Sequence, residues 1–330
     1  ALVTTSAAGT AREAAGVLGE SSVATVFGGE GMLGDMRSGG RFWLGGWFSP
    51  ARNLGFQIEY VSFEEETETF AGSDEFSILA RPFYNLQLFD EDSRLINFPD
   101  LVQGSLTVRA TSEFDTFEFS LLGPTLQIQG NTIQFLAGYR QANLDEVVRF
   151  DERMTSLVSP TLNSTFELFD EFDVDNTFHG YQLATQHSGR IGRCWFYDLT
   201  GKAAIGQTRS RLRVDGQTIT TTDAGDVATS REGLLALDTN IGTDGKYEFG
   251  SLFELGLNLR RCYSNGWQLR LGYSYLHWSS VLRAVEQIDR ELTPSEVPPD
   301  TRVGPSRPRR QLRYSGFWAQ GVNVGLEYRF

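Results

Sequence analysis

Apolar and polar side chains alternate at every second position along several stretches of the chain. In residues 317–330 one parity is small or polar, whereas the other carries Trp318, Val322, Val324, Leu326, Tyr328 and Phe330. Because successive side chains of a strand point to opposite faces, this stretch is predicted to be a strand with one apolar face. Residues 54–60, 133–140, 247–260 and 267–276 repeat the pattern.

The alternation predicts nine strands, with boundaries uncertain by a few residues. They lie at 38–49, 54–68, 103–121, 132–149, 176–187, 192–214, 245–262, 266–281 and 315–330. The short connections are 50–53, 122–131, 188–191 and 263–265, and the long ones are 69–102, 150–175, 215–244 and 282–314. Alternating short turns and long loops are typical of an outer-membrane β-barrel. A β-sandwich shares the side-chain alternation but mixes its connection lengths.

Two details of this pattern carry further expectations. Bacterial single-chain barrels normally have an even strand count, so a tenth, rising strand should precede 38–49. Residues 22–29 could supply it, or it lies before Ala1, which we favour.

Within 103–121 the apolar parity changes from even to odd between Ser112 and Asp115, which predicts a β-bulge there.

Composition and charge narrow the class of protein. The 330 residues include 35 Gly, 24 Phe, 11 Tyr and 6 Trp, and the net charge is −13. This acidic balance argues against nucleic acid as a partner, because nucleic-acid binders cluster Lys and Arg. No run approaches the roughly 20 apolar residues of a membrane helix. No signal peptide is visible at Ala1, so we expect secretion to the bacterial outer membrane through a signal peptide that this chain does not carry.

Several segments are similar to one known family. They are Leu2–Ser6, Arg37–Gly45, Leu234–Leu237 with Thr239–Gly242, Leu271–Ser279 with Gln287–Arg290, and Phe317–Phe330. Together they resemble the planctomycete outer-membrane family called putative β-barrel porin of the seventh type, over nearly the whole chain. The resemblance implies one barrel domain over 1–330, with 1–37 as an N-terminal loop segment and 38–330 as barrel strands and loops. It also implies a strand before Leu2.

The same resemblance supplies neither an established substrate nor catalytic residues. At Gly46, where relatives often have an aromatic residue, this chain departs from the family. A terminal aromatic such as Phe330 is typical of bacterial outer-membrane barrels. We therefore expect as partners the barrel-assembly machinery, which would bind through Phe330, and outer-membrane lipid with lipopolysaccharide.

The parity that faces away from lipid carries charges of both signs. The candidate lumen-lining residues are Glu59, Arg109, Glu118, Arg140, Asp198, Lys202, Glu254, Arg260, Arg270, Glu327 and Arg329. In a wide barrel such charges line a water-filled pore, and porin-like passage of small solutes is the leading expectation. A barrel of about ten strands has a narrow bore. Arg–carboxylate pairs could then plug the lumen and leave a structural or surface-interaction barrel.

Cys194 follows one short turn and Cys262 precedes another, so both would lie at the same end of neighbouring strands and face inward. Outside the cytoplasm cysteines are commonly oxidised. A disulfide between them and two free thiols are both open at this point, because sequence does not fix the register.

The sequence predicts no enzyme, cofactor or metal site. His277 is followed by Ser279 and Ser280, as a nucleophile and its base could be, but Ser at these spacings is common in strands. His179 and His187 are eight residues apart on one strand, about 26 Å by strand rise, so they cannot share a metal. Two acidic clusters lack the twelve-residue calcium-loop pattern and are expected to be solvated loop surface, with a divalent-ion bridge to anionic lipid headgroups as the alternative. They comprise Glu64, Glu65, Glu66, Glu68, Asp74 and Glu75, and Glu167, Asp170, Glu171, Asp173 and Asp175.

Overall fold

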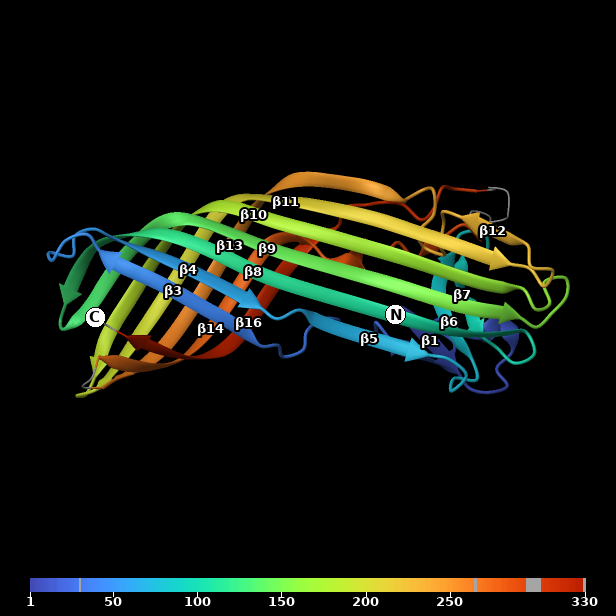
Figure 1. Cartoon of the computed structure of the whole chain (residues 1–330), viewed down its shortest axis with the longest axis horizontal. Coiled ribbons are helices and arrows are strands. Elements are labelled where there is room, and N and C mark those ends of the chain that lie inside the picture. The colour runs from blue at the N-terminus through green and yellow to red at the C-terminus, as the bar shows by residue number, and fades with distance from the viewer. Residues whose placement is uncertain (30, 264–265, 295–303, 329–330) are drawn as a thin grey trace.

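The chain folds almost entirely into β-strands, which form one long sheet and one short sheet (Figure 1). The computed structural model describes residues 1–29, 31–263, 266–294 and 304–328. We call the long sheet the barrel sheet. Its strands are β3 (Gly39–Trp47), β4 (Gly55–Phe63), β5 (Glu66–Gly72), β8 (Val102–Ile128), β9 (Asn131–Ser156), β10 (Thr165–Ile191), β11 (Trp195–Thr221), β12 (Val227–Ser230), β13 (Gly242–Cys262), β14 (Trp267–Leu282) and β16 (Tyr314–Tyr328).

Each of the nine expected strands overlaps a strand of the barrel sheet, which confirms the all-β class. The strand order is β16-β14-β13-β11-β10-β9-β8-β4-β3, with every neighbouring pair antiparallel. The sheet curls around one lumen, since Arg41 on β3 reaches Glu254 on β13 at 3.0 Å. The edge strands β3 and β16 run in the same direction. An antiparallel barrel closes with an even number of strands, so the tenth strand remains a prediction.

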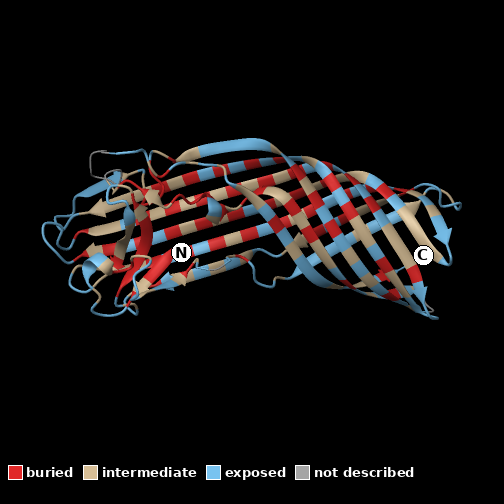
Figure 2. Cartoon of the chain, turned by 180° about the vertical axis from the view of Figure 1, so that it is seen from behind, coloured by how far each residue is buried: buried red, intermediate tan, exposed pale blue. Residues whose placement is uncertain are grey.

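The four strands β8, β9, β10 and β11 are 26 or 27 residues long and run along most of the length of the molecule (Figure 1). They pass through two regions of opposite polarity. Nearer the short turns the outward side chains are apolar and exposed, among them Phe119, Phe135, Leu183 and Ile205. We call this region the belt half. Figure 2 shows buried and exposed residues alternating along its strands. An apolar outward face with a polar inward face is typical of a membrane-spanning barrel.

Beyond the belt the polarity of the two faces is exchanged, and we call this region the distal half. On β8 the inward side chains Leu106, Val108 and Phe114 are buried and apolar, whereas inward Glu118 in the belt half is charged. The pairing with β9 runs without a shift from Val102 to Leu122. The bulge predicted between Ser112 and Asp115 is therefore wrong. The apolar parity changes because the strand leaves the belt and its inner face enters an apolar core.

The short sheet, here the cap sheet, covers the inner face of the distal half. It consists of β1 (Val3–Ser6), β2 (Val23–Phe27), β6 (Leu79–Asn85), β7 (Asp90–Asn97) and β15 (Glu291–Leu292). Val3, Leu79 and Ile96 of the cap pack with Val148 and Phe172 of the barrel sheet in one buried cluster. The distal half is thus a two-layer sandwich whose outer layer continues the barrel wall.

This arrangement corrects several expectations. Residues 1–37 are not only a loop segment, because they contain β1 and β2 as well as the 3-10 turn Arg12–Ala14. The strand at 22–29 exists as β2, but it pairs with β1 in the cap and not with the barrel wall. The expected long loop 69–102 contains β6 and β7, and most of 150–175 belongs to β9 and β10.

The connections at the belt end are short, as expected. β8 continues to Ile128 and turns into β9 through Gln129 and Gly130 alone, with φ of 51° and 82°. Positive φ at both central residues is the type I′ geometry that suits a two-residue hairpin. The 3-10 turn Ala284–Gln287 follows β14 at the distal side. No helix in the described part of the chain is long and apolar enough to cross a membrane.

Candidate functional site: a charged layer across the lumen

Six charged side chains meet inside the belt half, and we call them the ion-pair layer. They come from six strands and are Arg41, Glu59, Glu118, Arg140, Lys202 and Glu254. Cross-strand register places Glu59 opposite Glu118 and Glu118 opposite Arg140, and it places Lys202 opposite Glu254. The curl of the sheet brings these two rows together across the lumen.

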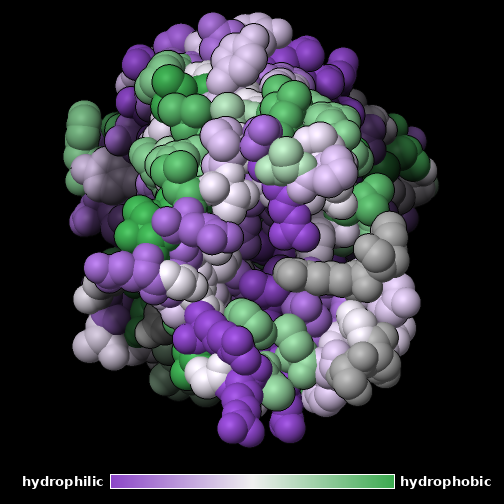
Figure 3. Space-filling model, turned by 90° about the vertical axis from the view of Figure 1, so that its left-hand side faces the viewer, coloured by the Kyte–Doolittle hydropathy of each residue, from purple (hydrophilic) through white to green (hydrophobic). Residues whose placement is uncertain are grey.

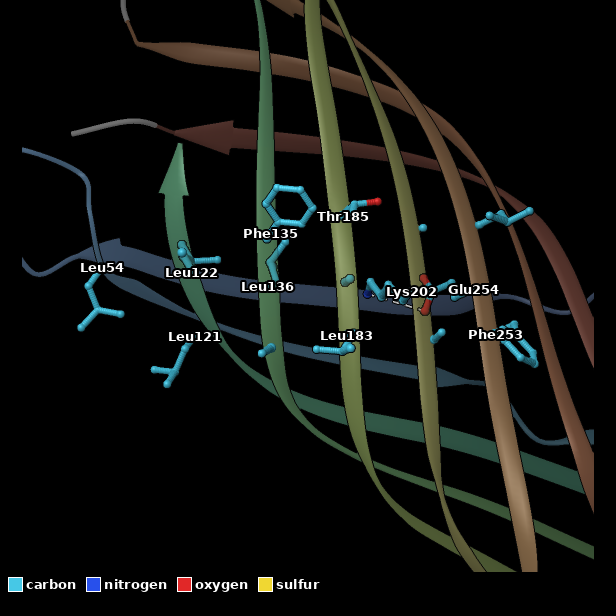
Figure 4. A pocket seen from close by; sticks show the side chains of 16 residues that line it. Leu54, Leu121, Leu122, Phe135, Leu136, Leu183, Thr185, Lys202, Phe253 and Glu254 are labelled. Carbon is cyan, nitrogen blue, oxygen red and sulfur yellow. Dashed lines mark ion pairs between the residues drawn. The ribbon is translucent and has the colours of Figure 1, made fainter. Parts of the chain in front are cut away.

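Lys202 lies at the centre of the layer. Its Nζ is 2.9 Å from Glu59 Oε2, 3.0 Å from Glu118 Oε2 and 3.6 Å from Glu254 Oε2. Figure 4 marks the pair between Lys202 and Glu254, which come from neighbouring strands. One ammonium therefore joins carboxylates from β4, β8 and β13.

The two arginines complete the pairing of the same carboxylates. Arg140 Nη1 lies 3.1 Å from Glu118 Oε1, and its Nη2 lies 2.9 Å from Glu254 Oε2. Arg41 Nη1 lies 2.8 Å from Glu59 Oε1, and its Nη2 lies 3.0 Å from Glu254 Oε1. Each carboxylate is thus bound by at least two cations, and three positive charges balance three negative ones.

Five of the six side chains in the ion-pair layer are nearly closed to solvent, whereas that of Arg41 on the edge strand β3 is 29% exposed. The side chains of Arg140 and Lys202 are 0% and 6% exposed, and that of Glu254 is 4% exposed. Buried charges are tolerated only when paired and hydrogen-bonded. Gln182 adds a bond by donating its amide N–H to Glu118 at 2.9 Å. The layer therefore places a network of paired side chains across the lumen.

A second layer of buried side chains lies next to the ion-pair layer, toward the distal half. Ten buried apolar residues form one cluster there, including Phe114, Phe178, Trp278 and Phe317. The Trp278 indole N–H donates to Thr208 Oγ1 at 3.0 Å, which satisfies the one polar atom of this side chain. We call this cluster the apolar layer. The lumen thus passes from paired charges to a packed aromatic core.

Toward the short turns the lumen is again polar. Arg260 Nη2 donates to Asp198 Oδ1 at 2.7 Å and its Nη1 donates to Gln268 at 2.9 Å. Arg270 lies 3.7 Å from Glu327 and stacks over the Trp43 ring at 5.2 Å. Figure 3 views the molecule along its long axis from this end, and hydrophilic side chains surround the recess at its middle.

The structure therefore brings together most of the charged residues that sequence singled out. Arg109 is the exception, because it points outward in the distal half and lies 3.6 Å from Glu65, with 60% of its side chain exposed. The error has the same cause as the predicted bulge, since the even parity faces inward along the whole of β8. Arg329 and the terminal Phe330 lie outside the described residues. Sequence reasoning missed Arg41, although Phe42 and Leu44 mark the opposite, outward parity of β3.

Comparison with known protein families matches residues 1–330 to one family, described as Putative beta barrel porin-7. The chain belongs to the Putative beta barrel porin-7 family. This result confirms the resemblance noted from the sequence and suggests an outer-membrane location. The match covers the barrel sheet and the cap sheet alike. No curated protein and no solved structure matches the chain.

A shallow trough of about 890 Å³ crosses the outer face of this porin-7 barrel. Its lining includes successive triplets from five neighbouring strands: 121–123, 135–137, 183–185, 201–203 and 253–255. Figure 4 shows Leu121, Leu183 and Phe253 from one row of these triplets. The flanking Leu183 and Leu255 are 70% and 60% exposed, whereas the middle residues Lys202 and Glu254 face the lumen. The trough is a lipid-side depression and not an entrance to the lumen.

A third polar cluster holds the cap of the porin-7 barrel against its wall. Arg81 of β6 is buried and lies 2.7 Å from Asp170 on β10, and it also binds Glu152 on β9. These carboxylates raise the pKa of Arg81 against the opposing effect of its burial. Asp170 Oδ1 accepts the backbone N–H groups of Leu234, Leu235 and Ala236 at 2.8–3.1 Å.

The remaining candidates have ordinary surroundings. His277 faces outward between Phe253 and Trp318 on the neighbouring strands, and His179 Nδ1 lies 2.5 Å from Tyr139 Oη. Asp170 of the second acidic cluster is a buried structural acceptor and not a solvated loop residue. In the first cluster, Glu68 accepts the backbone N–H of Leu33. Among the described residues, no group of three or more His, Cys, Asp or Glu is arranged to hold a metal ion.

Proposed function

We propose that this protein spans the outer membrane as a barrel that is closed to solutes and that it holds its distal sandwich at the cell surface. The observation that carries the proposal is the continuous filling of the lumen. The ion-pair layer is followed directly by the apolar layer, and then by the core between the barrel sheet and the cap sheet. A hydrated solute would have to displace packed side chains in all three.

The second candidate is a porin-like passage for small solutes that opens when the ion-pair layer rearranges. It is supported by the family and by the chemistry of the layer. The belt half keeps six charges inside the lumen where apolar side chains would fill the same space. Replacing buried ion pairs by apolar residues is often neutral or stabilising, so charges kept there are consistent with a lumen that is hydrated at times.

Planar-bilayer conductance separates the two candidates. The proteins to compare are the full chain and its double variant Lys202→Ala/Glu118→Ala, which removes one cation and one anion from the centre of the layer. The control is Arg153→Ala/Glu167→Ala, which removes an exposed pair 3.1 Å apart in the distal half. Heat-modifiable mobility in gels establishes first that each barrel is folded.

A closed barrel predicts no conductance steps from the unaltered protein, and none from the Lys202/Glu118 variant, since the apolar layer still fills the lumen. Steps should appear only when Phe114→Ala and Phe317→Ala are added to that variant. Steps from the unaltered protein would overturn the closed barrel. Steps from the Lys202/Glu118 variant alone would assign the ion-pair layer as a gate and support the porin-like function.

A further inference from the structure

Beyond the function of the lumen, we propose that Cys194 and Cys262 form a disulfide that joins β11 and β13 at the belt end. The two residues are 68 positions apart in sequence and stand at the margins of these neighbouring strands. Trp195, the first residue of β11, pairs with Arg261. The backbone N–H of Cys262 donates to the carbonyl oxygen of Cys194 at 3.0 Å, so the ladder continues through the cysteine pair.

The two cysteines lie directly opposite each other, one residue beyond the last pair of the β11–β13 ladder. Trp195 and Arg261 face outward, with the Arg261 guanidinium 5.6 Å from the Trp195 ring. Cys262 is the last residue of β13 and faces inward by alternation, and Cys194 is the turn residue directly before β11. Because a backbone hydrogen bond joins them, they form a hydrogen-bonded pair, in which the two Cα atoms are about 5.5 Å apart. This separation lies within the range of about 4.4–6.8 Å that disulfides span.

The pair is accessible to an oxidising protein. Both cysteines are free thiols in the structure, and Cys194 is exposed whereas Cys262 is half-buried. The neighbouring lumen groups Arg260, Asp198 and Gln268 bind one another.

The oxidant is a dithiol–disulfide oxidoreductase of the compartment between the two bacterial membranes, and this part of the inference rests on the proposed outer-membrane location. The thiolate of exposed Cys194 attacks the oxidoreductase disulfide and forms a mixed disulfide. The Cys262 thiolate then displaces the oxidoreductase, which leaves as a dithiol. Two thiols lose two electrons and two protons, and one disulfide of the oxidoreductase is reduced.

The bond would fix the register of β11 against β13 at the belt end, directly beyond Trp195 and Arg261, the last pair of that ladder. At the other end of this pairing, Val214 opposes Gly242, and beyond it β11 pairs with the short strand β12 instead. At its distal end β11 thus changes its neighbour from β13 to β12, whereas at the belt end the disulfide would hold β11 against β13.

The test is alkylation of the exported, folded full-length protein with N-ethylmaleimide, followed by intact mass measurement. The disulfide predicts no adduct before reduction and two adducts after treatment with dithiothreitol in denaturant. Peptide mapping without reductant should recover the peptides of Cys194 and Cys262 as one linked species. Two adducts before reduction, or a linkage between two chains, would overturn the proposal.

A second measurement keeps the test independent of the variants' folding yield and of the conductance result. Urea unfolding of the unaltered protein is followed with and without reductant. The midpoint should fall in reductant for the unaltered protein, and it should not move for Cys194→Ser/Cys262→Ser. Equal midpoints for the unaltered protein under both conditions would count against a bond in the folded state. Either result leaves the lumen proposal unaffected.

Discussion

At the scale of single residues, acidic side chains have different roles on the two faces and in the two halves of the barrel. Glu118 is buried and paired in the lumen of the belt half, whereas Asp145 stands on the outer face of the distal half. Asp145 lies directly opposite Glu113 on β8 and Asp175 on β10. Like charges in such positions repel, so this row of acids is a local source of instability.

The pKa of Asp145 provides the first prediction. Partial burial, followed by the charges of Asp175, Glu113, Asp115 and Asp173, raises this pKa to about 6. The folded state therefore binds a proton more tightly than the unfolded chain does. Protonation of Asp145 therefore stabilises the folded state at about pH 4, and this stabilisation is lost as the pH rises through 6. After allowance for solvent screening of a half-exposed group, the loss is about 1 kcal/mol.

Asp145→Asn should accordingly be more stable than the unaltered protein by about 1 kcal/mol at pH 8, with a smaller difference at pH 4. Urea unfolding in lipid vesicles at the two pH values measures this change. Asp223→Asn, in the exposed turn after β11, controls for the loss of one surface charge. A stabilisation of equal size at both pH values would contradict the assigned pKa.

Arg81 provides the opposite case, a charge whose removal should destabilise the protein. Arg81→Leu leaves Glu152 and Asp170 buried without their shared cation. Breaking one side of a buried ion pair costs about 3–5 kcal/mol. We expect this loss in the free energy of unfolding, measured in urea. Arg153→Leu, which removes an exposed pair with Glu167, should cost less than about 1 kcal/mol.

At the scale of elements, the strands β8 to β11 each carry two different surfaces in succession. Along the outer face of β9, Phe135 belongs to the belt and Val147 to the distal half. The change of surface needs no bulge or break, because the pairing between β9 and β10 continues from Thr165 to Ser188. The same hydrogen-bonded ladder thus continues from the belt half into the distal half. The residue types on each face change at the boundary between the two halves.

This change gives a prediction for two matched substitutions on one strand. Phe135→Arg places a charge on the lipid side and should cost about 2–4 kcal/mol if it lies near the bilayer midplane. Val147→Arg makes the same change on the same face of β9 in the distal half. It should cost little, because Asp173 lies directly opposite. Unfolding in vesicles measures both, and equal costs would contradict the placement of the belt.

The sequence predicted the belt half well and the distal half poorly, for a physical reason. In the belt half every second residue meets lipid, so alternation reveals the strands, and it placed Glu59, Lys202 and Glu254 on the inner face. In the distal half the inner face becomes apolar, and the change of parity was interpreted as a bulge. Arg109 was misplaced for that reason. The cap strands are short, and apolar and polar side chains do not alternate from Leu79 to Phe83, so neither period marked β6 as a strand of a second sheet.

At the scale of the whole molecule, the barrel and the distal sandwich share their strands and form a single structural unit. The wall strands of the belt half continue as the outer layer of the sandwich, and the cap fills the inner face (Figures 1 and 2). The two ends of the molecule therefore differ in kind. Short turns connect the strands at the belt end, whereas the distal end consists of the sandwich and its loops.

The proposed orientation predicts which end can be labelled on intact cells. In a cysteine-free background, Ala224→Cys lies in the exposed turn after β11, and Ala51→Cys lies in the exposed turn between β3 and β4. A maleimide that cannot cross membranes should label position 224 on whole cells. It should label position 51 only after the outer membrane is broken. The reverse pattern would invert the proposed orientation.

The uninterrupted strands have a mechanical consequence. At about 3.3 Å per residue, a strand of 27 residues extends for roughly 90 Å, several times the apolar band of about 25 Å that a membrane barrel needs. A force applied to the distal tips would pass along β8 to β11 as shear on many hydrogen bonds, because no linker stands between the tips and the wall. A partner bound to these distal tips would therefore be connected rigidly to the cell envelope through the continuous strands.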